Sequence, residues 1–505
     1  MGAITFSRNA SPDNPPFARS MPFRQSVLPS LPRRNQVSGR NKTSRSTEAA
    51  PLYSPPFSTR KVVLEWFVPE SKKVLIIGGG FAGLACAQTL ANDSRFQVTL
   101  IDRENHHLFQ PLLYQVATTS LAAPDIARSL RSILSKADNV KVLLDTITKV
   151  DPLTKVATSN GRQYSFDHLV LACGARTSFF GHDQWAEHTI GLKTLGDAHR
   201  IRARVLSALE RAELTEDLAE RRRLMTILLI GGGPTGVELA GAFSDLVRRA
   251  LRSDFRNIDP AELKIILVQS GVRLLEPFDP ELSKYAKHRL QDLGVEVLLD
   301  TSVDDIQPGR VHLDEGSTCA LVSSEGWVKA ETIIWAAGVQ AHDLTKQIGV
   351  ETDRAGRIAV EPDLSLPGFS DLFAAGDIIN LVDKNGVQVP GLSPAAAQAG
   401  KHIAKLLKEE ARLETTDHAK RKVFLRPKFA YWDKGTMAVI GKNVAVMQTE
   451  KIRMKGFFAW IAWLLVHIAF LVGFRSKLFV LLQWAYAYLV DKPGARVFFN
   501  REDND

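Results

Sequence analysis

The chain has 505 residues, 45% apolar and 24% charged, an ordinary composition for a globular protein large enough for two or three domains. Most of its formal charge of +9 comes from residues 1–61, which hold ten Lys or Arg, so general nucleic-acid binding is not favoured. The three cysteines, Cys86, Cys173 and Cys319, are far apart in sequence, which excludes a CxxC or CxxxxC dithiol and gives no sign of a disulfide framework. Redox chemistry would therefore require a bound cofactor.

Residues 1–71 are rich in Pro, Ser, Asn and Arg and show no sustained hydrophobic periodicity, so we expect a disordered basic extension. No secretory hydrophobic segment precedes residue 62. Three interpretations stay open for this extension: an organelle transit peptide, a basic membrane tether, and a tail without function.

The first strand–turn–helix–strand unit follows this extension. A short apolar run at residues 73–77 predicts a buried parallel strand, and the glycine-rich sequence 78–83 follows it directly. The pattern then predicts a helix over 84–92 and a second strand over 96–101, which ends at Asp102.

The same order recurs about 150 residues later. An apolar strand over 225–230 precedes a glycine-rich turn at 231–236, a helix from 237 towards 252, and a strand over 263–268 that ends at Gln269. Alternating strands and helices predict an α/β fold with two Rossmann-type, doubly wound parallel sheets.

Both turns match the pattern G-x-G-x-x-G, at Gly78, Gly80 and Gly83 and again at Gly231, Gly233 and Gly236. In this pattern the first glycine permits a tight turn, the second lets the backbone approach a pyrophosphate, and the third lets the helix pack closely on the strand. The phosphate then lies at a helix N-terminus, where unpaired N–H groups favour an anion. One match would be weak, but two in the same structural context predict two dinucleotide sites.

The residue that ends the second strand differs between the units. Asp102 can accept hydrogen bonds from an adenosine ribose, although an ordinary strand-end carboxylate is the alternative. Gln269 is neutral and Arg273 lies nearby, so the 2′-phosphate of NADPH would not be repelled. We therefore expect weaker discrimination between NADH and NADPH than a Glu would give.

Several segments resemble the type II NADH dehydrogenases, which are NADH:quinone oxidoreductases that do not pump protons. They are residues 105–117 (NHHLFQPLLYQVA), 231–241 (GGGPTGVELAG), 433–437 (DKGTM), and the tail from Phe470 to Trp484. The resemblance covers residues 72–499, nearly all of the chain beyond the basic extension.

The resemblance implies a flavoprotein with an FAD domain in two parts, residues 72–195 and 346–410, and a nicotinamide-dinucleotide domain, 196–345, inserted between them. Residues 411–455 would form a β-rich segment on the quinone side, and 456–505 amphipathic helices that attach to a membrane. Asp377 matches the acid that holds the ribityl chain of FAD. Further cofactor contacts are expected at Arg103, Gln110, Ala172, Gly174, Gly338 and Gly376, and no metal site is expected.

Three residues are expected to act in catalysis by resemblance. Glu238 matches a glutamate near the flavin that influences quinone reduction, although it could be only a helix-dipole partner. Gln398 matches the second glutamine of a quinone motif whose first glutamine is replaced here by Pro394. Lys434 matches a basic residue near the quinone headgroup, with a solvated loop lysine as the alternative.

The implied activity is transfer of two electrons from NADH, and from NADPH if accepted, through non-covalently bound FAD to a membrane quinone. Two apolar stretches, 457–472 and 478–490, carry interfacial Trp and Tyr and basic flanks, which favours monotopic attachment. A single membrane span and a buried dimer-forming tail are the alternatives for this tail. We expect the cytoplasmic face of a bacterial plasma membrane, with an organelle membrane as the alternative, and a homodimer stays open.

Two other functions stay open from the residues. A sulfide:quinone oxidoreductase would need cysteines near the flavin and usually has no working nicotinamide site. A redox sensor with negligible turnover would keep both glycine turns but would not need Gln398, Lys434 or an apolar tail.

Overall fold

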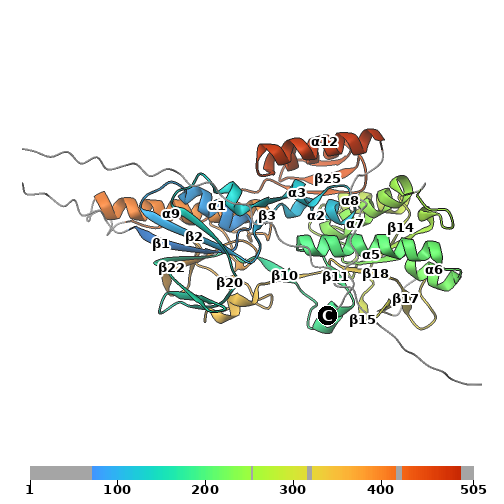
Figure 1. The fold of residues 1–505 in the computed structure, drawn as a ribbon, viewed down its shortest axis with the longest axis horizontal. Helices are drawn as coiled ribbons and strands as arrows, with labels where there is room; N and C mark the ends of the chain where they lie inside the picture. Colours follow the sequence, from blue (N-terminus) through green and yellow to red (C-terminus); the bar gives the residue numbers. More distant parts are fainter. Residues whose placement is uncertain (1–70, 252–253, 315–320, 417–423, 491–505) are drawn as a thin grey trace, which may run out of the picture. The chain divides into compact units, whose positions relative to one another are not determined.

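The computed structural model describes residues 71–251, 254–314, 321–416 and 424–490 (Figure 1). The basic extension expected at 1–71 falls, except for its last residue, outside the described residues, as do Cys319 and the end of the tail at 491–505. Everything below concerns the unit that begins at Val68.

The first sheet has six strands in the order β21-β22-β9-β1-β2-β5. All neighbours run parallel except β21, which is antiparallel to β22. Its central strand β1 is fully buried from Val74 onwards because helices cover the sheet, which explains its unbroken apolar run. The strands are β1 (Lys72–Ile77), β2 (Phe96–Asp102), β5 (Val140–Leu144), β9 (His168–Leu171), β21 (Ser365–Leu366) and β22 (Phe369–Ala374).

Helices α1 (Phe81–Leu90) and α9 (Ser393–Thr416) pack side by side against this sheet, although they are 300 residues apart (Figure 1). Gly400 permits their contact, because a Cβ there would collide with the backbone of Ala82. Helix α9 continues to Thr416, past the end expected for this part of the domain at residue 410. Its buried apolar positions keep the helical spacing through Ala411 and Leu413.

The second sheet has five parallel strands in the order β11-β18-β12-β13-β14. Its first strand lies before the domain boundary expected at residue 195, since Ile190 and Gly191 already pair with β18. A strand of two residues is too short to show a periodic pattern in the sequence. The strands are β11 (Ile190–Gly191), β12 (Thr226–Ile230), β13 (Lys264–Val268), β14 (Val295–Leu298) and β18 (Thr332–Trp335).

Four main helices accompany this second sheet: α5 (Leu195–Leu214), α6 (Leu218–Leu224), α7 (Pro234–Asp245) and α8 (Pro280–Asp292). Helix α7 starts three residues earlier than expected, since Pro234 suits the first helical turn, where no N–H partner is needed. One π-helical turn, Leu246–Ala250, then follows it.

Shorter elements complete the two domains. Antiparallel ladders are β6 (Ile147–Asp151), β7 (Val156–Ser159) and β8 (Arg162–Ser165); β15 (Val303–Gln307), β16 (Arg310–Leu313) and β17 (Trp327–Lys329); β10 (Ala175–Thr177) with β19 (Val339–Ala341); and β3 (His106–Leu108) with β4 (Ala127–Ser129). Strands β20 (Ile358–Ala359) and β23 (Ile379–Asn380) pair in parallel. The short helices are α2 (Leu113–Ala117), α3 (Ala123–Ile126) and α4 (Leu130–Ile133), with 3-10 turns at Gln110–Leu112, Asp183–Glu187, Pro260–Glu262 and Asp343–Gln347.

The C-terminal part consists of a three-stranded antiparallel sheet and two apolar helices. The strands are β24 (Thr436–Val439), β25 (Ala445–Gln448) and β26 (Arg453–Gly456), and the helices are α11 (Phe457–Phe470) and α12 (Phe474–Val490). Among the described residues of the segment expected to be β-rich, strands occupy only the second half, since residues 424–435 form no regular element. Within the described residues, no helix is both long and apolar enough to cross a bilayer.

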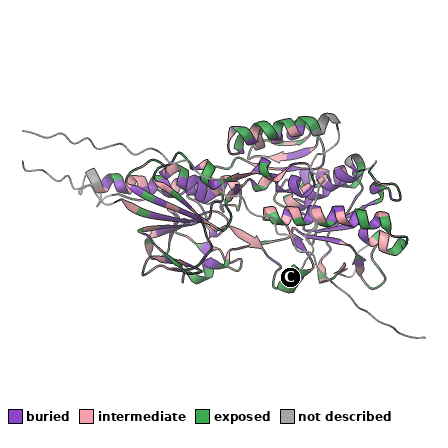
Figure 2. Ribbon diagram, viewed as in Figure 1, coloured by how far each residue is buried: buried purple, intermediate pink, exposed green. Residues whose placement is uncertain are grey.

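One side of α11 and one side of α12 are buried and the other sides are exposed, as Figure 2 shows for α12. Trp460, Trp463 and Trp484 join the same hydrophobic core as helices α5 and α7. The indole Nε1–H of Trp484 donates to Oε1 of the buried Gln115 at 2.8 Å, which fixes α12 on α2. The exposed side carries many large apolar residues.

Candidate dinucleotide-binding active site

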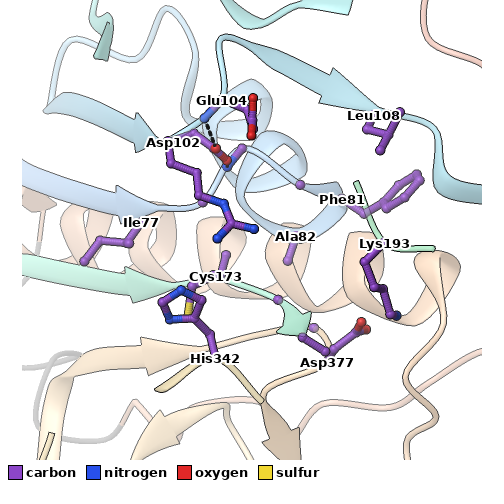
Figure 3. A pocket seen from close by; sticks show the side chains of 18 of the residues that line it. Ile77, Phe81, Ala82, Asp102, Glu104, Leu108, Cys173, Lys193, His342 and Asp377 are labelled. Atoms are coloured by element: carbon purple, nitrogen blue, oxygen red, sulfur yellow. Dashed lines mark hydrogen bonds between the residues drawn. The ribbon is translucent and has the colours of Figure 1, made fainter. Parts of the chain in front are cut away.

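The first glycine turn borders a cavity of about 290 Å³ at the carboxyl ends of β1, β2, β9 and β22 (Figure 3). This is the edge of an open α/β sheet where ligands bind. The N-terminal ends of α1 and α9 also reach the cavity, and their unpaired N–H groups favour an anion. Nine of the residues expected to contact FAD line this cavity: Gly78, Gly80, Asp102, Arg103, Gln110, Ala172, Gly174, Gly376 and Asp377.

A different steric condition applies at each of the three glycines of the first turn. Gly78 has φ +109°, and a Cβ there would run into the carbonyl of Ala172. At Gly80 a Cβ would meet no atom within 4 Å, so its Cα faces the open cavity. At Gly83 a Cβ would collide with the carbonyl oxygen of Gly78, which means that the close approach of α1 to the turn requires glycine.

The second glycine turn repeats these three conditions. Gly231 has φ +111°, and a Cβ there would lie 2.6 Å from the Cα of Ala337. Gly233 faces open space, and a Cβ at Gly236 would collide with the carbonyl of Gly231. The two turns are therefore equivalent in backbone geometry and in packing, as the repeated motif predicts.

Asp102 and Gln269 occupy equivalent places in the two units. The Oδ2 of Asp102 accepts a hydrogen bond from the Gly79 N–H at 2.5 Å, and Oδ1 accepts one from Glu104 N–H at 2.7 Å (Figure 3). The Oε1 of Gln269 likewise accepts from the Gly232 N–H at 2.6 Å. The same bond is thus made by a carboxylate in the first unit and by a neutral amide in the second.

Asp377 follows Gly376, which has φ +86°, and points into the cavity (Figure 3). Burial raises the pKa of its carboxyl, and the nearby Lys193 ammonium partly offsets that rise. Lys193 also lines the cavity, and its carbonyl accepts a hydrogen bond from Nε2 of Gln110 at 3.1 Å. The sequence analysis missed Lys193, because a loop lysine between β11 and α5 belongs to no recognisable motif.

Gly338 lies elsewhere, just after β18 in the connection between the two sheets. Its carbonyl accepts a hydrogen bond from the Ser178 N–H at 3.1 Å, and a Cβ at Gly338 would collide with the ring of Phe180. Glycine is therefore needed here for the close packing of two connecting segments.

Glu238 lies on the first turns of α7, directly after the second glycine turn. Burial raises the pKa of its carboxyl to about 8, while a hydrogen bond from the Val439 backbone opposes this rise. At neutral pH the side chain is therefore protonated and carries an O–H donor.

Gln398 and Lys434 are brought together through Trp432. The Gln398 amide donates to the Trp432 carbonyl at 3.1 Å and accepts from the Trp432 N–H at 3.0 Å, so both of its ends are occupied. The ammonium of Lys434 lies 5.0 Å from the Trp432 ring and 4.7 Å from the ring of Phe470 on α11. Pro394 lies in the first turn of α9, where proline is tolerated.

Comparison with known proteins agrees with this geometry. Residues 72–400 match the family model for pyridine nucleotide-disulphide oxidoreductases. A type II NADH:quinone oxidoreductase of Mycobacterium tuberculosis is 38% identical over 437 residues, which cover 84% of this chain and 90% of that protein. The chain belongs to the type II NADH:quinone oxidoreductases. More distant members include an internal alternative NAD(P)H-ubiquinone oxidoreductase of Arabidopsis thaliana mitochondria, 27% identical over 85% of this chain and 86% of that one.

Solved structures support the same fold. The NDH2 of Plasmodium falciparum in complex with NADH superposes with a TM-score of 0.75 at 20% identity, over 84% of this chain and 99% of that chain. The sulfide:quinone oxidoreductase of Aquifex aeolicus superposes less well, with a TM-score of 0.61 at 16% identity over 81% and 92% of the two chains.

Proposed function

We propose that the protein transfers two electrons from NADH through FAD to a membrane quinone without pumping protons. The observation that carries this proposal is the pair of equivalent glycine turns, each at the carboxyl edge of a parallel sheet. Two dinucleotide sites in one chain suit an enzyme that holds a flavin in one and receives a nicotinamide in the other.

The cavity of the first turn suits FAD. Gly80 leaves room for a pyrophosphate, two helix N-termini favour its charge, and the carboxylate of Asp102 can accept from an adenosine ribose. Asp377 and Lys193 line the same cavity and would hold the ribityl chain and the flavin ring. When bound there, FAD would supply the two-electron redox chemistry between the nicotinamide and the quinone.

The second turn receives the reduced nicotinamide dinucleotide, with Gly233 next to its pyrophosphate. Gln269 brings no negative charge to the ribose, so NADPH is accepted as well as NADH. This widens the donor beyond the NADH named for the Mycobacterium tuberculosis relative and agrees with the NAD(P)H named for the Arabidopsis thaliana one.

Three residues act on the quinone side of the reaction. Glu238 keeps its proton at neutral pH and can supply it as the quinone is reduced. Gln398 holds the backbone of Trp432, so a bond to a quinone carbonyl would replace one of these two bonds. Lys434, kept between two aromatic rings, places a positive charge where a reduced quinone would gain negative charge.

The exposed side of α11 and α12 attaches the enzyme to the membrane surface. It presents Phe458, Leu465, Phe470, Leu478, Phe479, Leu481, Leu482 and Tyr486, all more than a third exposed. Such a large exposed apolar surface marks a lipid or protein interface. The basic residues Lys434, Arg453, Lys455 and Arg475 lie on or beside these helices and suit an anionic, cytoplasmic leaflet. A homodimer is the competing occupant of this surface.

The absorption spectrum of the purified protein tests the enzymatic proposal. We expect a flavin spectrum that NADH bleaches and that a short-chain quinone then restores. Sulfide in place of NADH should leave the spectrum unchanged. A colourless protein that cannot be reconstituted with FAD, or a flavin that neither NADH nor NADPH reduces, would refute the assignment.

Vesicle flotation tests the membrane surface. Leu465→Glu combined with Leu482→Glu should move the protein from anionic vesicles to the soluble fraction and spare NADH oxidation with a soluble acceptor. Leu153→Glu changes a leucine on the β6–β7 turn that is even more exposed, at 83% against 66% for Leu465 and 55% for Leu482, and serves as the control. Unchanged flotation together with a loss of dimer mass in solution would assign the surface to a second copy of the chain.

A further inference from the structure

His107 is a buried polar side chain beside the first glycine turn, and no motif assigns it a task. It is only 2% exposed, and its ring packs edge-on against Phe81 with the ring centroids 4.9 Å apart. Its Nδ1 lies 3.0 Å from the carbonyl oxygen of Gly79, whereas its Nε2 is buried without a hydrogen-bond partner among the described residues. Burying an imidazole in apolar surroundings costs free energy unless one of its nitrogens makes a hydrogen bond that the protein needs.

The carbonyl oxygen can only accept, so Nδ1 must carry the proton and donate it. Burial lowers the pKa of His107, hence the ring is neutral near pH 7 and has a single N–H. The donor is held in place because His107 lies on β3, where it pairs with Arg128 of β4.

A fixed Gly79 carbonyl also fixes the N–H of Gly80. The peptide bond between them is planar and trans, so its C=O and N–H point in opposite directions. Since the carbonyl points at His107, the Gly80 N–H points the other way. Gly80 borders the cavity and a side chain there would meet no protein atom, so this N–H is available to a pyrophosphate.

The second turn provides an internal comparison. The N–H groups of Gly78 and Gly231 each donate at 2.8 Å to the carbonyl of a strand residue, Ile101 and Val268 respectively. The next N–H along each turn donates to a side chain: that of Gly79 donates to Asp102, and that of Gly232 donates to Gln269.

The carbonyls of Gly79 and Gly232 also each accept a hydrogen bond, but from different kinds of donor. The Gly232 carbonyl accepts from the backbone N–H of Leu275 at 2.8 Å, and Leu275 adopts a left-handed φ of +50°. In the first turn the Gly79 carbonyl accepts the corresponding bond from the His107 side chain. Both turns therefore hold the N–H and the carbonyl of Gly79 or Gly232, which belong to successive peptide units, and only in the first turn is the carbonyl held by a side chain that substitution can remove.

We propose that His107 is a positioning residue for FAD, which orients the Gly79–Gly80 peptide so that the Gly80 N–H meets the pyrophosphate. The inference rests on the proposed binding of FAD at the first turn. It predicts that the Nδ1 donor, rather than the bulk of the ring, determines how tightly FAD binds.

Three substitutions separate donor, position and volume. In His107→Asn the amide nitrogen can take the place of Nδ1, in His107→Leu the shape is similar without a donor, and in His107→Gln the donor lies one bond too far. The flavin is removed from each purified full-length protein, and FAD is added back while its fluorescence is followed. The thermal midpoint of each flavin-free protein reports any structural damage.

We expect His107→Asn to bind FAD nearly as tightly as the unchanged protein, and His107→Leu to bind about tenfold or more weakly, at similar flavin-free midpoints. Equal affinities of the Leu variant and the unchanged protein would overturn the inference. If the Leu variant does not fold, the Asn and Gln variants decide: affinity kept by Asn and lost by Gln supports it, and equal affinities overturn it. An unchanged protein that binds no FAD would instead refute the proposed function.

Discussion

Glu238→Gln should change how the stability of the protein depends on pH. Burial raises the pKa of the Glu238 carboxyl to about 8, from 4.5 when it is solvated. Glutamine has nearly the same shape, is always neutral and can still accept from the Val439 N–H. The two proteins should therefore have similar stability at low pH, where both side chains are uncharged, and should diverge as the pH rises.

The size of the divergence follows from proton linkage. Between pH 4.5 and about pH 8 the unfolded chain has released this proton while the folded chain retains it. Each pH unit in this window lowers the free energy of unfolding by about 1.4 kcal/mol relative to the Gln variant. From about pH 5.5 to about pH 7.5 the unchanged protein should thus lose about 2–3 kcal/mol that the variant keeps. Above about pH 8 the folded carboxyl ionises as well, and the difference stops growing.

Thermal melting followed by tryptophan fluorescence measures this effect. Both proteins are melted over the same pH series at one scan rate, and only the difference between their midpoints is used, because all other titrating groups are shared. The midpoint of the Gln variant should rise relative to that of the unchanged protein by a few degrees across this window. Two profiles that stay parallel would show that the carboxyl ionises normally, and would remove its proposed role as a proton donor.

Gln269→Glu should lower kcat/KM for NADPH at least about tenfold and affect NADH less, because a carboxylate repels the 2′-phosphate; an unchanged protein that already prefers NADH more than about a thousandfold would contradict this reading. Gly83→Ala should lower the thermal midpoint even of flavin-free protein, whereas Gly80→Ala, whose methyl enters open space, should weaken FAD binding without that loss. Trp484→Phe removes the buried donor to Gln115 and should cost about 1–3 kcal/mol in unfolding free energy, measured by chemical denaturation; no change would mean that α12 is held by packing alone.

Much of the fold could be predicted from the sequence because its signals are local. An apolar run, a glycine turn and an amphipathic helix each lie within about 30 residues, and the physics of the turn requires glycine at fixed offsets. Gly78 and Gly231 were therefore identified without any knowledge of the residues they touch. Element bounds are harder to predict where the pattern is short or continuous, as in the two-residue strand at Ile190 and in α9, which runs on beyond residue 410.

The candidate site could be predicted only in part, because several of its groups act through partners far away in sequence. Lys193 belongs to no motif, and the segment 105–117 that contains His107 gives that residue no role, so their places beside Asp377 and Gly79 follow only from the packing of separate strands and loops. The sequence indicated Gln398 as a residue on the quinone side by resemblance, and only the fold shows that its amide pairs with the backbone of Trp432.

The sequence by itself thus determined the two dinucleotide turns, the acid and the amide that follow their second strands, and the apolar character of the tail. Only the tertiary structure decided which groups hold each turn from the outside, how far burial shifts the pKa of Glu238, and which side of the tail helices stays exposed. Hydrogen-bond direction, burial and exposure depend on what surrounds a side chain in space, and the order of residues along the chain does not specify those surroundings locally.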